Sequence, residues 1–304
     1  MVDITHKIIT LRTATAQAIV KVGSPATMQA ILNKTVPKGD VLEVARTAGL
    51  FAVKNTSNAI PDCHPMPIEY TGIRFECLED SVLIEVTVKA IYRTGVEVEA
   101  MHGASIVALT MYDMLKPIDK NVEISTIKLL HKKGGKSDYG NKEVQRLSVA
   151  VMVCSDSVSS GKKEDKAGKV ITEKIKNLGL SISKYSVIPD EIIDIQNSIH
   201  AFCEQNIDLI LITGGTGLSN RDVTPEAVLP LLDRRIPGIE EAIRSYGQDR
   251  TPYAMLSRSV AGFKGNTLIM ALPGSTAGAS ESMDAVFPSV LHLFKLLNGF
   301  DHGK

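Results

Sequence analysis

Apolar and more polar residues alternate over residues 81–93. This period of two predicts a strand with one wetter face. Residues 68–78 have the same character and predict an antiparallel neighbour across a short turn. From residue 97 to 116 the period becomes helical, and Pro117 ends it. Antiparallel strands with helices on one face predict an α+β, ferredoxin-like fold for this part of the chain.

The second half follows a different pattern, in which near-continuous apolar runs alternate with helical stretches. The strand-like runs are 147–154, 182–188, 209–212 and 268–272, and the helical stretches between them are 164–178, 192–203 and 225–232. Runs of this kind are typical of a buried, mostly parallel sheet with helices on both faces. The prediction is a three-layer α/β fold, in which ligands bind beyond the carboxyl ends of the strands.

A polar, glycine-rich stretch over residues 132–143 separates these two patterns. Stretches of this composition between periodic segments are typical of linkers. We therefore predict two domains, residues 1–141 and residues 147–304.

Composition excludes several classes of partner. The chain has 34 Lys and Arg against 34 Asp and Glu, so neither a nucleic acid nor a membrane surface is an expected partner. Trp is absent, and no apolar run is long enough for a membrane span or a signal peptide. The four cysteines show no CxxC spacing, which favours reduced thiols in the cytoplasm.

The predicted helix over 97–116 carries ionisable residues at both ends of one stripe, which we expect to face the core. The stripe consists of Glu99, His102, Ile106, Leu109, Asp113 and Lys116. One interpretation of its last two residues is an exposed ion pair at i,i+3. The other is a partly buried acid–base pair that lines a pocket.

Four lysines stand in the nine residues 128–136, together with two glycines and no acid. Such a segment can converge on one anion, with Arg12 and Lys38 as further cations, or it is a solvated loop. His64 lies between two prolines and is either a proton carrier or structural. A metal site from Glu97, Glu99, His64 and His102 is a weaker alternative, because the spacing is loose.

Five segments, in the same order along the chain, resemble the MoaC family of cyclic pyranopterin monophosphate synthases. They are residues 38–40, 60–65, 94–100, 109–116 and 132–137. The resemblance implies that cyclised dihydro-GTP is rearranged to a pyranopterin with a cyclic phosphate and that pyrophosphate is released. It also implies a pocket built from two subunits, and so a homo-oligomer, with a hexamer as the candidate size.

The resemblance assigns roles by matching position. Asp113 is the catalytic acid–base and Lys116 lies beside it. Four cations are expected to bind the phosphates and the purine-derived ring: Lys38, Lys132, Lys136 and Arg12. Four further residues are expected to contact the substrate: Cys63, His64, Val98 and Glu99. Asp62 departs from the family, which usually has an apolar residue there.

Acidic residues and glycine turns follow the strands of the second half. Asp156 and Asp190 stand just after two of the predicted strands, and Asp222 follows the turn at 213–217. A second turn comprises Gly274 and Ser275. Thr224 is expected to cap a helix that begins at Pro225. Each Asp alone is an ordinary turn residue, but together at one sheet edge they favour a nucleotide–Mg²⁺ site.

This half resembles the MoaB/MogA family of molybdopterin-binding domains over residues 147–298. The matching segments include 155–156, 160–168, 189–190, 213–217, 221–226 and 272–274. The resemblance implies molybdopterin adenylyltransferase activity with Mg-ATP and no tightly bound cofactor. It assigns catalysis to Asp190 and Asp222, with Asp222 also positioning Mg²⁺. It assigns ligand binding to Asp156, Gly214, Gly215, Thr216, Gly217, Gly274 and Ser275.

The chain is thus expected to be a bifunctional enzyme of molybdenum cofactor biosynthesis, with cyclised dihydro-GTP, molybdopterin and ATP as substrates. An alternative is that the second domain is a non-catalytic pterin-binding or oligomerisation module. A general nucleotide-binding regulator is a third possibility, and it would bind ATP without any affinity for pterins.

Overall fold

The computed structural model describes residues 1–135, 138 and 147–297. The chain forms two compact units, residues 1–138 and 139–304. The predicted domain boundary between residues 141 and 147 lies outside the described residues and stays a prediction. None of the helices in the described part has both the length and the apolar character that crossing a membrane requires.

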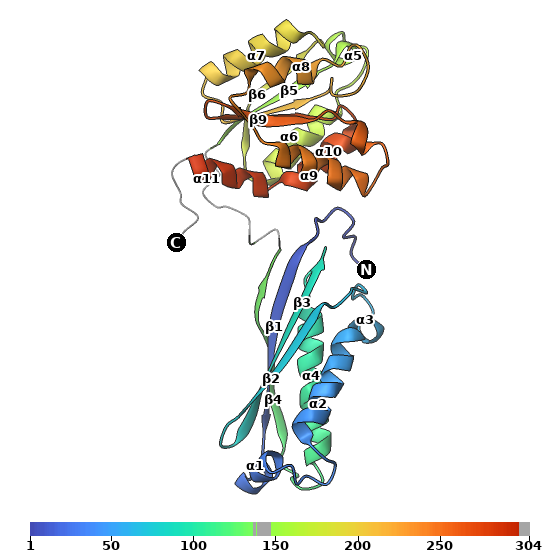
Figure 1. Cartoon of the computed structure of the whole chain (residues 1–304), viewed down its shortest axis with the longest axis vertical. Coiled ribbons are helices and arrows are strands. Elements are labelled where there is room, and N and C mark those ends of the chain that lie inside the picture. The colour runs from blue at the N-terminus through green and yellow to red at the C-terminus, as the bar shows by residue number, and fades with distance from the viewer. Residues whose placement is uncertain (136–137, 139–146, 298–304) are drawn as a thin grey trace. The chain divides into compact units, whose positions relative to one another are not determined.

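The first unit is a four-stranded antiparallel sheet in the order β2-β3-β1-β4. The strands are β1 (Thr10–Lys21), β2 (Tyr70–Cys77), β3 (Ser81–Tyr92) and β4 (Glu123–Lys133). The helices are α1 (Pro25–Leu32), α2 (Val41–Lys54), α3 (Thr56–Ala59) and α4 (Glu97–Leu115). The sheet carries α2 and α4 on one face (Figure 1). The predicted antiparallel α+β fold is confirmed.

Small residues let the helices of this unit approach closely. A Cβ at Gly49 of α2 would lie 2.4 Å from the side chain of Val107, and one at Gly103 of α4 would lie 2.6 Å from Val53. Beneath α4, β1 presents alanines and β3 presents valines, and both sets are fully buried. The alternation seen in the sequence therefore faces the helices, as a half-buried strand requires.

The predicted core-facing stripe of α4 is wrong. Leu109 is 54% exposed, and Asp113 and Lys116 are also exposed. The core face instead carries mostly small residues, Ala100, Gly103, Ala104, Val107, Ala108 and Met111. Small residues lie where α4 packs closely on the alanine-rich β1, and the larger Met111, Met114 and Leu115 are buried toward its carboxyl end, so the buried face is turned away from Leu109.

The second unit is a six-stranded sheet in the order β6-β5-β7-β10-β9-β8. Its strands are β5 (Ser148–Cys154), β6 (Ser181–Ile188), β7 (Leu209–Thr213), β8 (Arg234–Arg235), β9 (Val260–Lys264) and β10 (Thr267–Leu272). The first four in spatial order are parallel, and β9 and β8 form an antiparallel edge. The predicted mostly parallel α/β fold is confirmed, and the antiparallel edge is an addition to it.

Helices cover both faces of this sheet. They are α5 (Asp156–Ser159), α6 (Ala167–Asn177), α7 (Ile192–Glu204), α8 (Thr224–Val228), α9 (Pro237–Gln248), α10 (Thr276–Val286) and α11 (Leu293–Leu297). In Figure 1, α7 and α8 lie on one side and α6, α9 and α10 on the other. Each side has its own apolar core, which explains why the central strands are apolar at nearly every position.

Thr224 differs from its predicted role as a helix cap. It is the first residue of α8, and its hydroxyl donates to the carbonyl of Gly214 at 2.9 Å. Its backbone N–H donates to the carbonyl of Gly215 at 3.0 Å. Thr224 therefore fixes the glycine turn after β7.

Candidate functional sites

Three of the predicted residues meet at the carboxyl end of α4. The ammonium of Lys38 donates to one carboxylate oxygen of Asp113 at 2.7 Å, and that of Lys116 lies 2.7 Å from the other. These hydrogen bonds, with that of Lys116 the stronger, lower the pKa of Asp113 to about 2. In a single chain this is an exposed, ionised carboxylate between two ammonium groups.

A second cluster lies at the amino end of α4. The thiol of Cys63 donates to Glu99 Oε1 at 3.0 Å. Glu99 is only 2% exposed, and its Oε2 has no hydrogen-bond partner. Burial, together with the hydrogen bond and charge of Glu99, raises the pKa of the Cys63 thiol to about 12. A buried, half-satisfied carboxylate is costly, and a ligand that donates to it would remove that cost.

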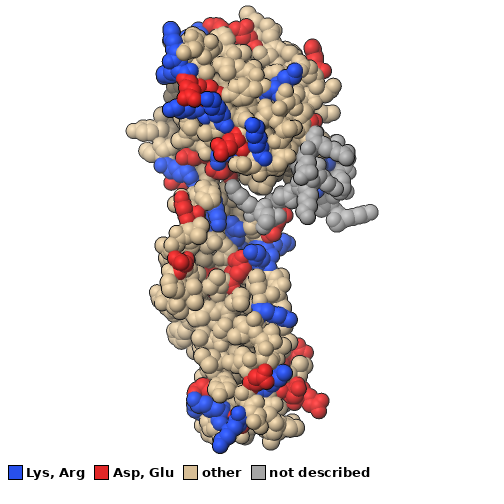
Figure 2. Space-filling model, turned by 180° about the vertical axis from the view of Figure 1, so that it is seen from behind, with Lys and Arg blue, Asp and Glu red and all other residues tan. Residues whose placement is uncertain are grey.

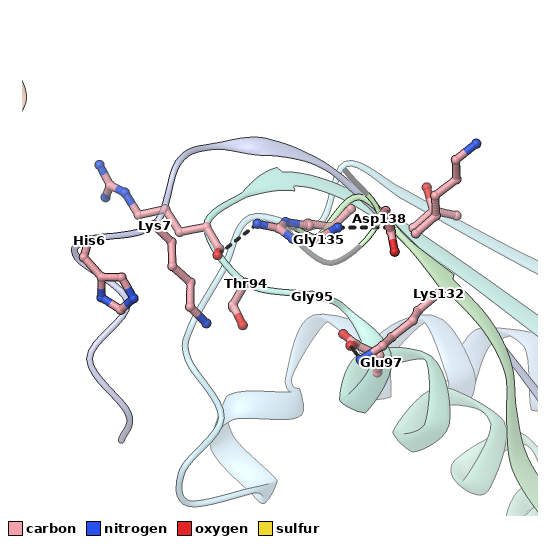
Figure 3. A pocket seen from close by; sticks show the side chains of 12 residues that line it. His6, Lys7, Thr94, Gly95, Glu97, Lys132, Gly135 and Asp138 are labelled. Atoms are coloured by element: carbon pink, nitrogen blue, oxygen red, sulfur yellow. Dashed lines mark hydrogen bonds and ion pairs between the residues drawn. The ribbon is translucent and has the colours of Figure 1, made fainter. Parts of the chain in front are cut away.

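A cavity of about 280 Å³ lies at the same end of α4, whose first residue Glu97 lines it, and it is formed where β1 begins and β3 and β4 end. Figure 3 shows Lys132 paired with Glu97 on one side of the cavity, and His6 and Lys7 on the other. Thr94 and Gly95 lie between them. Positively charged side chains outnumber carboxylates in the lining, so the cavity suits an anion.

Arg12 lines the same cavity but is largely engaged. It is 7% exposed and donates to the carbonyls of Tyr92 and Arg93 at 3.1 and 3.2 Å. These bonds tie β1 to the end of β3, so Arg12 holds the wall of the cavity in shape.

The other predicted residues of this unit are distributed unevenly. His64 donates to the carbonyl of Val2 at 2.9 Å, Val98 is exposed, and Lys136 lies outside the described residues. Lys133, one of the four lysines of residues 128–136, lines the cavity. Lys7 lines it too but was missed by the sequence analysis, because no motif marks it and its only signal is that it stands just before β1.

The two clusters of α4 are far apart within one chain. Glu99 and Asp113 are 14 positions apart on one helix, which at about 1.5 Å per residue is a separation of about 21 Å. Asp113 and the cavity residues therefore cannot surround one small substrate within a single copy.

Two glycine turns meet at the carboxyl edge of the second unit's sheet. Gly214 has φ +101°, and a Cβ there would lie 2.1 Å from the carbonyl oxygen of Cys154. A Cβ at Gly274 would lie 2.9 Å from Gly214 Cα. Only glycine allows this approach, which places the turn after β7 against the turn after β10. Ser275 caps α10, accepting from the backbone N–H of Gly278 at 3.1 Å.

Asp156 and Asp190 meet at this same edge, as predicted. The backbone N–H of Asp156 donates to Asp190 Oδ2 at 3.0 Å, and that of Asp190 donates to Asp156 Oδ1 at 3.1 Å. Asp190 Oδ1 is buried without a partner. Burial raises the pKa of Asp190 against its hydrogen bond from Asp156, and the charges of Asp156 and Asp222 add to the rise.

Asp222 lies beside the glycine turn. Its Oδ2 accepts from the N–H of Ser219 at 2.8 Å, and a Cβ at Gly217 would lie 2.8 Å from the same oxygen. The neighbouring Arg221 binds both oxygens of Asp156 at 3.0 Å and Glu191 at 2.9 Å. The three predicted aspartates are thus joined through one arginine and one turn.

Arg258 is a positioning residue that the sequence analysis missed. Its side chain donates to the carbonyl of Gly217 at 2.8 Å and to that of Asp222 at 2.6 Å, and it pairs with Glu226. Arg258 precedes β9, an antiparallel strand that was not predicted, so its position could not be inferred from the strand pattern.

Within residues 1–135, 138 and 147–297, no three His, Cys, Asp or Glu side chains are placed to hold a metal ion. The alternative metal site from Glu97, Glu99, His64 and His102 is therefore not assembled there. All four cysteines are free thiols. On the face that Figure 2 shows, acidic and basic side chains are intermixed within each unit.

Comparisons with known proteins agree with both resemblances. A family model described as "MoaC family" matches residues 1–135, and one described as "Probable molybdopterin binding domain" matches residues 150–292. A cyclic pyranopterin monophosphate synthase of Geotalea uraniireducens is 47% identical over 148 residues, which cover 48% of this chain and 92% of that protein. The solved structure of MoaB from Thermus thermophilus is 41% identical and covers 51% of this chain and 98% of that one, with a TM-score of 0.48.

One relative matches across both units. A molybdenum cofactor biosynthesis bifunctional protein of Chlorobaculum tepidum is 39% identical over 302 residues, which are 99% of this chain and 96% of that protein. The chain therefore belongs to the family of bifunctional molybdenum cofactor biosynthesis proteins, with a MoaC domain followed by a MoaB/MogA-type domain.

Proposed function

We propose that the first unit converts cyclised dihydro-GTP to cyclic pyranopterin monophosphate and releases pyrophosphate. The observation that carries this proposal is Asp113 held between Lys38 and Lys116, in a unit that resembles a synthase of that name. A carboxylate that is ionised above pH 2 serves as a base, and the adjacent ammonium of Lys116 serves as the acid that returns a proton.

The cavity at the other end of α4 supplies the binding half of this site. Lys132, Lys7 and Lys133 offer cations for a triphosphate, and the orphaned oxygen of Glu99 offers an acceptor for the N–H groups of the ring. Cys63 keeps Glu99 in position through its hydrogen bond.

The two halves come together only if a second copy takes part. Because about 21 Å of helix separates Glu99 from Asp113, we infer a homo-oligomer in which Asp113 of one copy faces the cavity of another. The hexamer suggested by the family is one such assembly.

The test for the first unit is release of pyrophosphate from cyclised dihydro-GTP by the full chain. Asp113→Ala is expected to abolish this release while circular dichroism stays unchanged. Glu79→Ala, which removes an exposed carboxylate from the turn between β2 and β3, is the control and is expected to retain turnover. Equal activity of Asp113→Ala and the wild type would overturn the assignment.

For the second unit we propose adenylylation of molybdopterin. The terminal phosphate of molybdopterin attacks the α-phosphate of ATP, a new phosphoanhydride bond forms, and pyrophosphate leaves. The observation that carries this proposal is the buried, unpartnered oxygen of Asp190 at the sheet edge that also holds Asp222 and two amide-rich turns. Gly214 to Gly217, Gly274 and Ser275 would bind phosphate through the backbone.

The donor set at this edge fits Mg²⁺ that enters with ATP. Magnesium in nucleotide sites is held by one or two carboxylates plus phosphate oxygens. Asp222 has one oxygen engaged by Ser219 and one left over, and Asp190 has its orphaned oxygen. When bound, the ion would neutralise charge on the phosphates. Asp156 is occupied by Arg221, so its part is to hold Asp190 in place.

The test for the second unit is formation of adenylylated molybdopterin from ATP. Asp222→Asn is expected to reduce turnover at least about a hundredfold, whereas Asp249→Asn, at the C-cap of α9, is expected to leave it unchanged. Wild-type binding of molybdopterin without any ATP turnover would favour the non-catalytic module instead. ATP binding without pterin affinity would favour the nucleotide-binding regulator.

A further inference from the structure

A carboxylate of the chain occupies part of the cation-lined cavity in the first unit. Asp138 lines that cavity beside Gly135 (Figure 3), and it is exposed. Its Oδ2 accepts from the backbone N–H of Gly134 at 2.6 Å and from that of Gly135 at 3.2 Å. An anion that belongs to the protein is therefore bound in a cavity that suits an anionic ligand.

The first of these two amides is held in place by β1 as well. The hydroxyl of Thr10 donates to the carbonyl of Gly134 at 2.7 Å. Gly134 is buried with φ +106°, and a Cβ there would collide with the carbonyl oxygen of Leu11, so this close approach requires glycine. Two successive N–H groups that point at one oxygen form a backbone anion site. Contacts with β1 thus support this anion site independently of Asp138.

Asp138 differs from the other carboxylate in the lining of the cavity. Glu97 forms an ion pair with Lys132 at 2.8 Å, so a side chain of opposite charge compensates it. Asp138 is bound by backbone amides, which are neutral, and its negative charge acts on the cavity. Lys132 responds to both, because its pKa is raised first by the hydrogen bond and charge of Glu97 and then by the charge of Asp138. A polyphosphate that enters the cavity meets the charge of Asp138.

A phosphate can take the place of Asp138 on the two amides. Phosphate oxygens accept from backbone N–H groups as carboxylate oxygens do, and they also attract Lys7, Lys132 and Lys133 in the same lining. The exchange preserves both amide hydrogen bonds, and an exposed carboxylate is readily hydrated once it leaves them. If both anions stayed, they would repel one another at close range. Exchange is therefore favoured over joint occupancy.

Resting on the proposed synthase activity, we propose that Asp138 is a built-in competitor for the phosphates of the substrate. Without substrate, its carboxylate occupies the amides of Gly134 and Gly135, and a phosphate of cyclised dihydro-GTP displaces it. When pyrophosphate departs, Asp138 returns to the amides and so assists the release. The competition lowers the affinity of the site for the substrate and for pyrophosphate alike.

The test measures binding of inorganic pyrophosphate to the full chain by isothermal titration calorimetry. Asp138→Asn keeps an oxygen that accepts from both amides but removes the negative charge, so we expect about tenfold tighter binding. Asp80→Asn removes the same charge from the turn at the other end of β3 and is expected to match the wild type. Pyrophosphate is also the proposed product of the second unit, so the binding to be compared is the part that Lys132→Ala abolishes.

Asp138→Glu separates competition from support of the loop. It keeps the charge near the amides, so its affinity for pyrophosphate should stay within about threefold of the wild type. If Asp138 only supports the loop, Asp138→Asn binds pyrophosphate as the wild type does, or more weakly, and the proposal is overturned. A Glu variant that binds as tightly as the Asn variant overturns it too, as does the absence of Lys132-dependent binding from both the wild type and Asp138→Asn.

Kinetics separates this proposal from the proposed function. If the wild type turns over cyclised dihydro-GTP, Asp138→Asn should lower KM and the inhibition constant of pyrophosphate about tenfold, without a rise in kcat. Turnover with both constants unchanged overturns the competition and leaves the synthase activity in place. Tighter pyrophosphate binding by Asp138→Asn in a protein without turnover supports the competition and overturns the synthase activity.

Discussion

Asp156 and Asp190 hold one another by a reciprocal pair of bonds, in which each backbone N–H donates to the other's carboxylate, at 3.0 and 3.1 Å. The pair joins the residue that starts α5 to the residue after β6, and Arg221 closes it from outside by a two-pronged contact with Asp156. Because Arg221 precedes Asp222, the orientation of both proposed catalytic aspartates depends on this contact.

Arg221→Ala is expected to shift the pH dependence of adenylylation. Burial raises the pKa of Asp190 and the positive charge of Arg221 opposes that rise, so removing Arg221 raises the pKa further. Asp190 must be ionised to position a cation, so the acidic limb of the pH–rate profile should move to higher pH. Turnover should then fall more at the acidic end of the pH range than at pH 8.

The control for this shift is Lys176→Ala, which removes one positive charge from the exposed end of α6. It should leave the profile unchanged. An equal loss of rate at every pH in Arg221→Ala would mean that Arg221 supports the fold of the loop and not the charge of Asp190.

Mixing two inactive variants is expected to restore synthase activity. Asp113→Ala lacks the proposed base, and Lys132→Ala lacks a phosphate-binding cation at the other end of α4. If each site takes Asp113 from one copy and Lys132 from another, a dimer with one copy of each variant has one intact site of two. After random exchange of equal amounts about half of the dimers are mixed, so pyrophosphate release should reach about a quarter of the wild-type rate.

Each variant alone, taken through the same exchange, supplies the baseline for that experiment. A mixture that stays inactive although mass spectrometry shows mixed oligomers would place both residues in the same copy's site. That result would contradict the shared pocket, which we infer from the separation of about 21 Å along α4.

The sequence pattern was sufficient to predict β2 and β3 of the first sheet, the four parallel strands of the second sheet and the meeting of Asp156 with Asp190, but not β1, β4, β8 or β9. Near-continuous apolar runs predict parallel strands, and the carboxyl ends of parallel strands meet at one edge of the sheet, so Asp156 and Asp190 could be expected to share that edge. The contacts that fix the edge were not predictable in this way. Arg258 reaches Gly217 from a segment 41 residues away, and no local pattern encodes that approach.

The first site shows a second limit of sequence reasoning. Periodicity alone placed Leu109 in the core, because it treats a large apolar side chain as a buried one. The buried face of α4 runs instead through residues 100, 104, 107, 108, 111 and 115, and only the spatial neighbours of the helix reveal which face that is. Likewise, Asp113 and Lys132 are separated because α4 is long. The motifs that contain these two residues do not reveal this separation.

Gly214→Ala is expected to destabilise the second unit far more than Gly161→Ala. Both glycines have positive φ, +101° and +72°, so each alanine carries backbone strain of ~1–2 kcal/mol. A Cβ at Gly161 meets nothing within 4 Å, whereas one at Gly214 would lie 2.1 Å from a carbonyl oxygen. The added overpacking should cost a further ~1–3 kcal/mol. Calorimetry of the full chain would measure both shifts, and equal shifts would contradict the close contact.

Glu99→Gln is expected to make Cys63 react faster with iodoacetamide. Burial together with the hydrogen bond and charge of Glu99 raises the pKa of this thiol to about 12, so very little thiolate is present at pH 8. A neutral glutamine removes the contribution of the charge, the pKa falls, and the thiolate fraction rises at any pH below it. Peptide mass spectrometry would follow alkylation of Cys63, with Cys77 as an internal reference because burial alone raises its pKa. If the rate at Cys63 relative to Cys77 does not change, Glu99 is not ionised beside the thiol, and its proposed acceptance of ring N–H groups loses its basis.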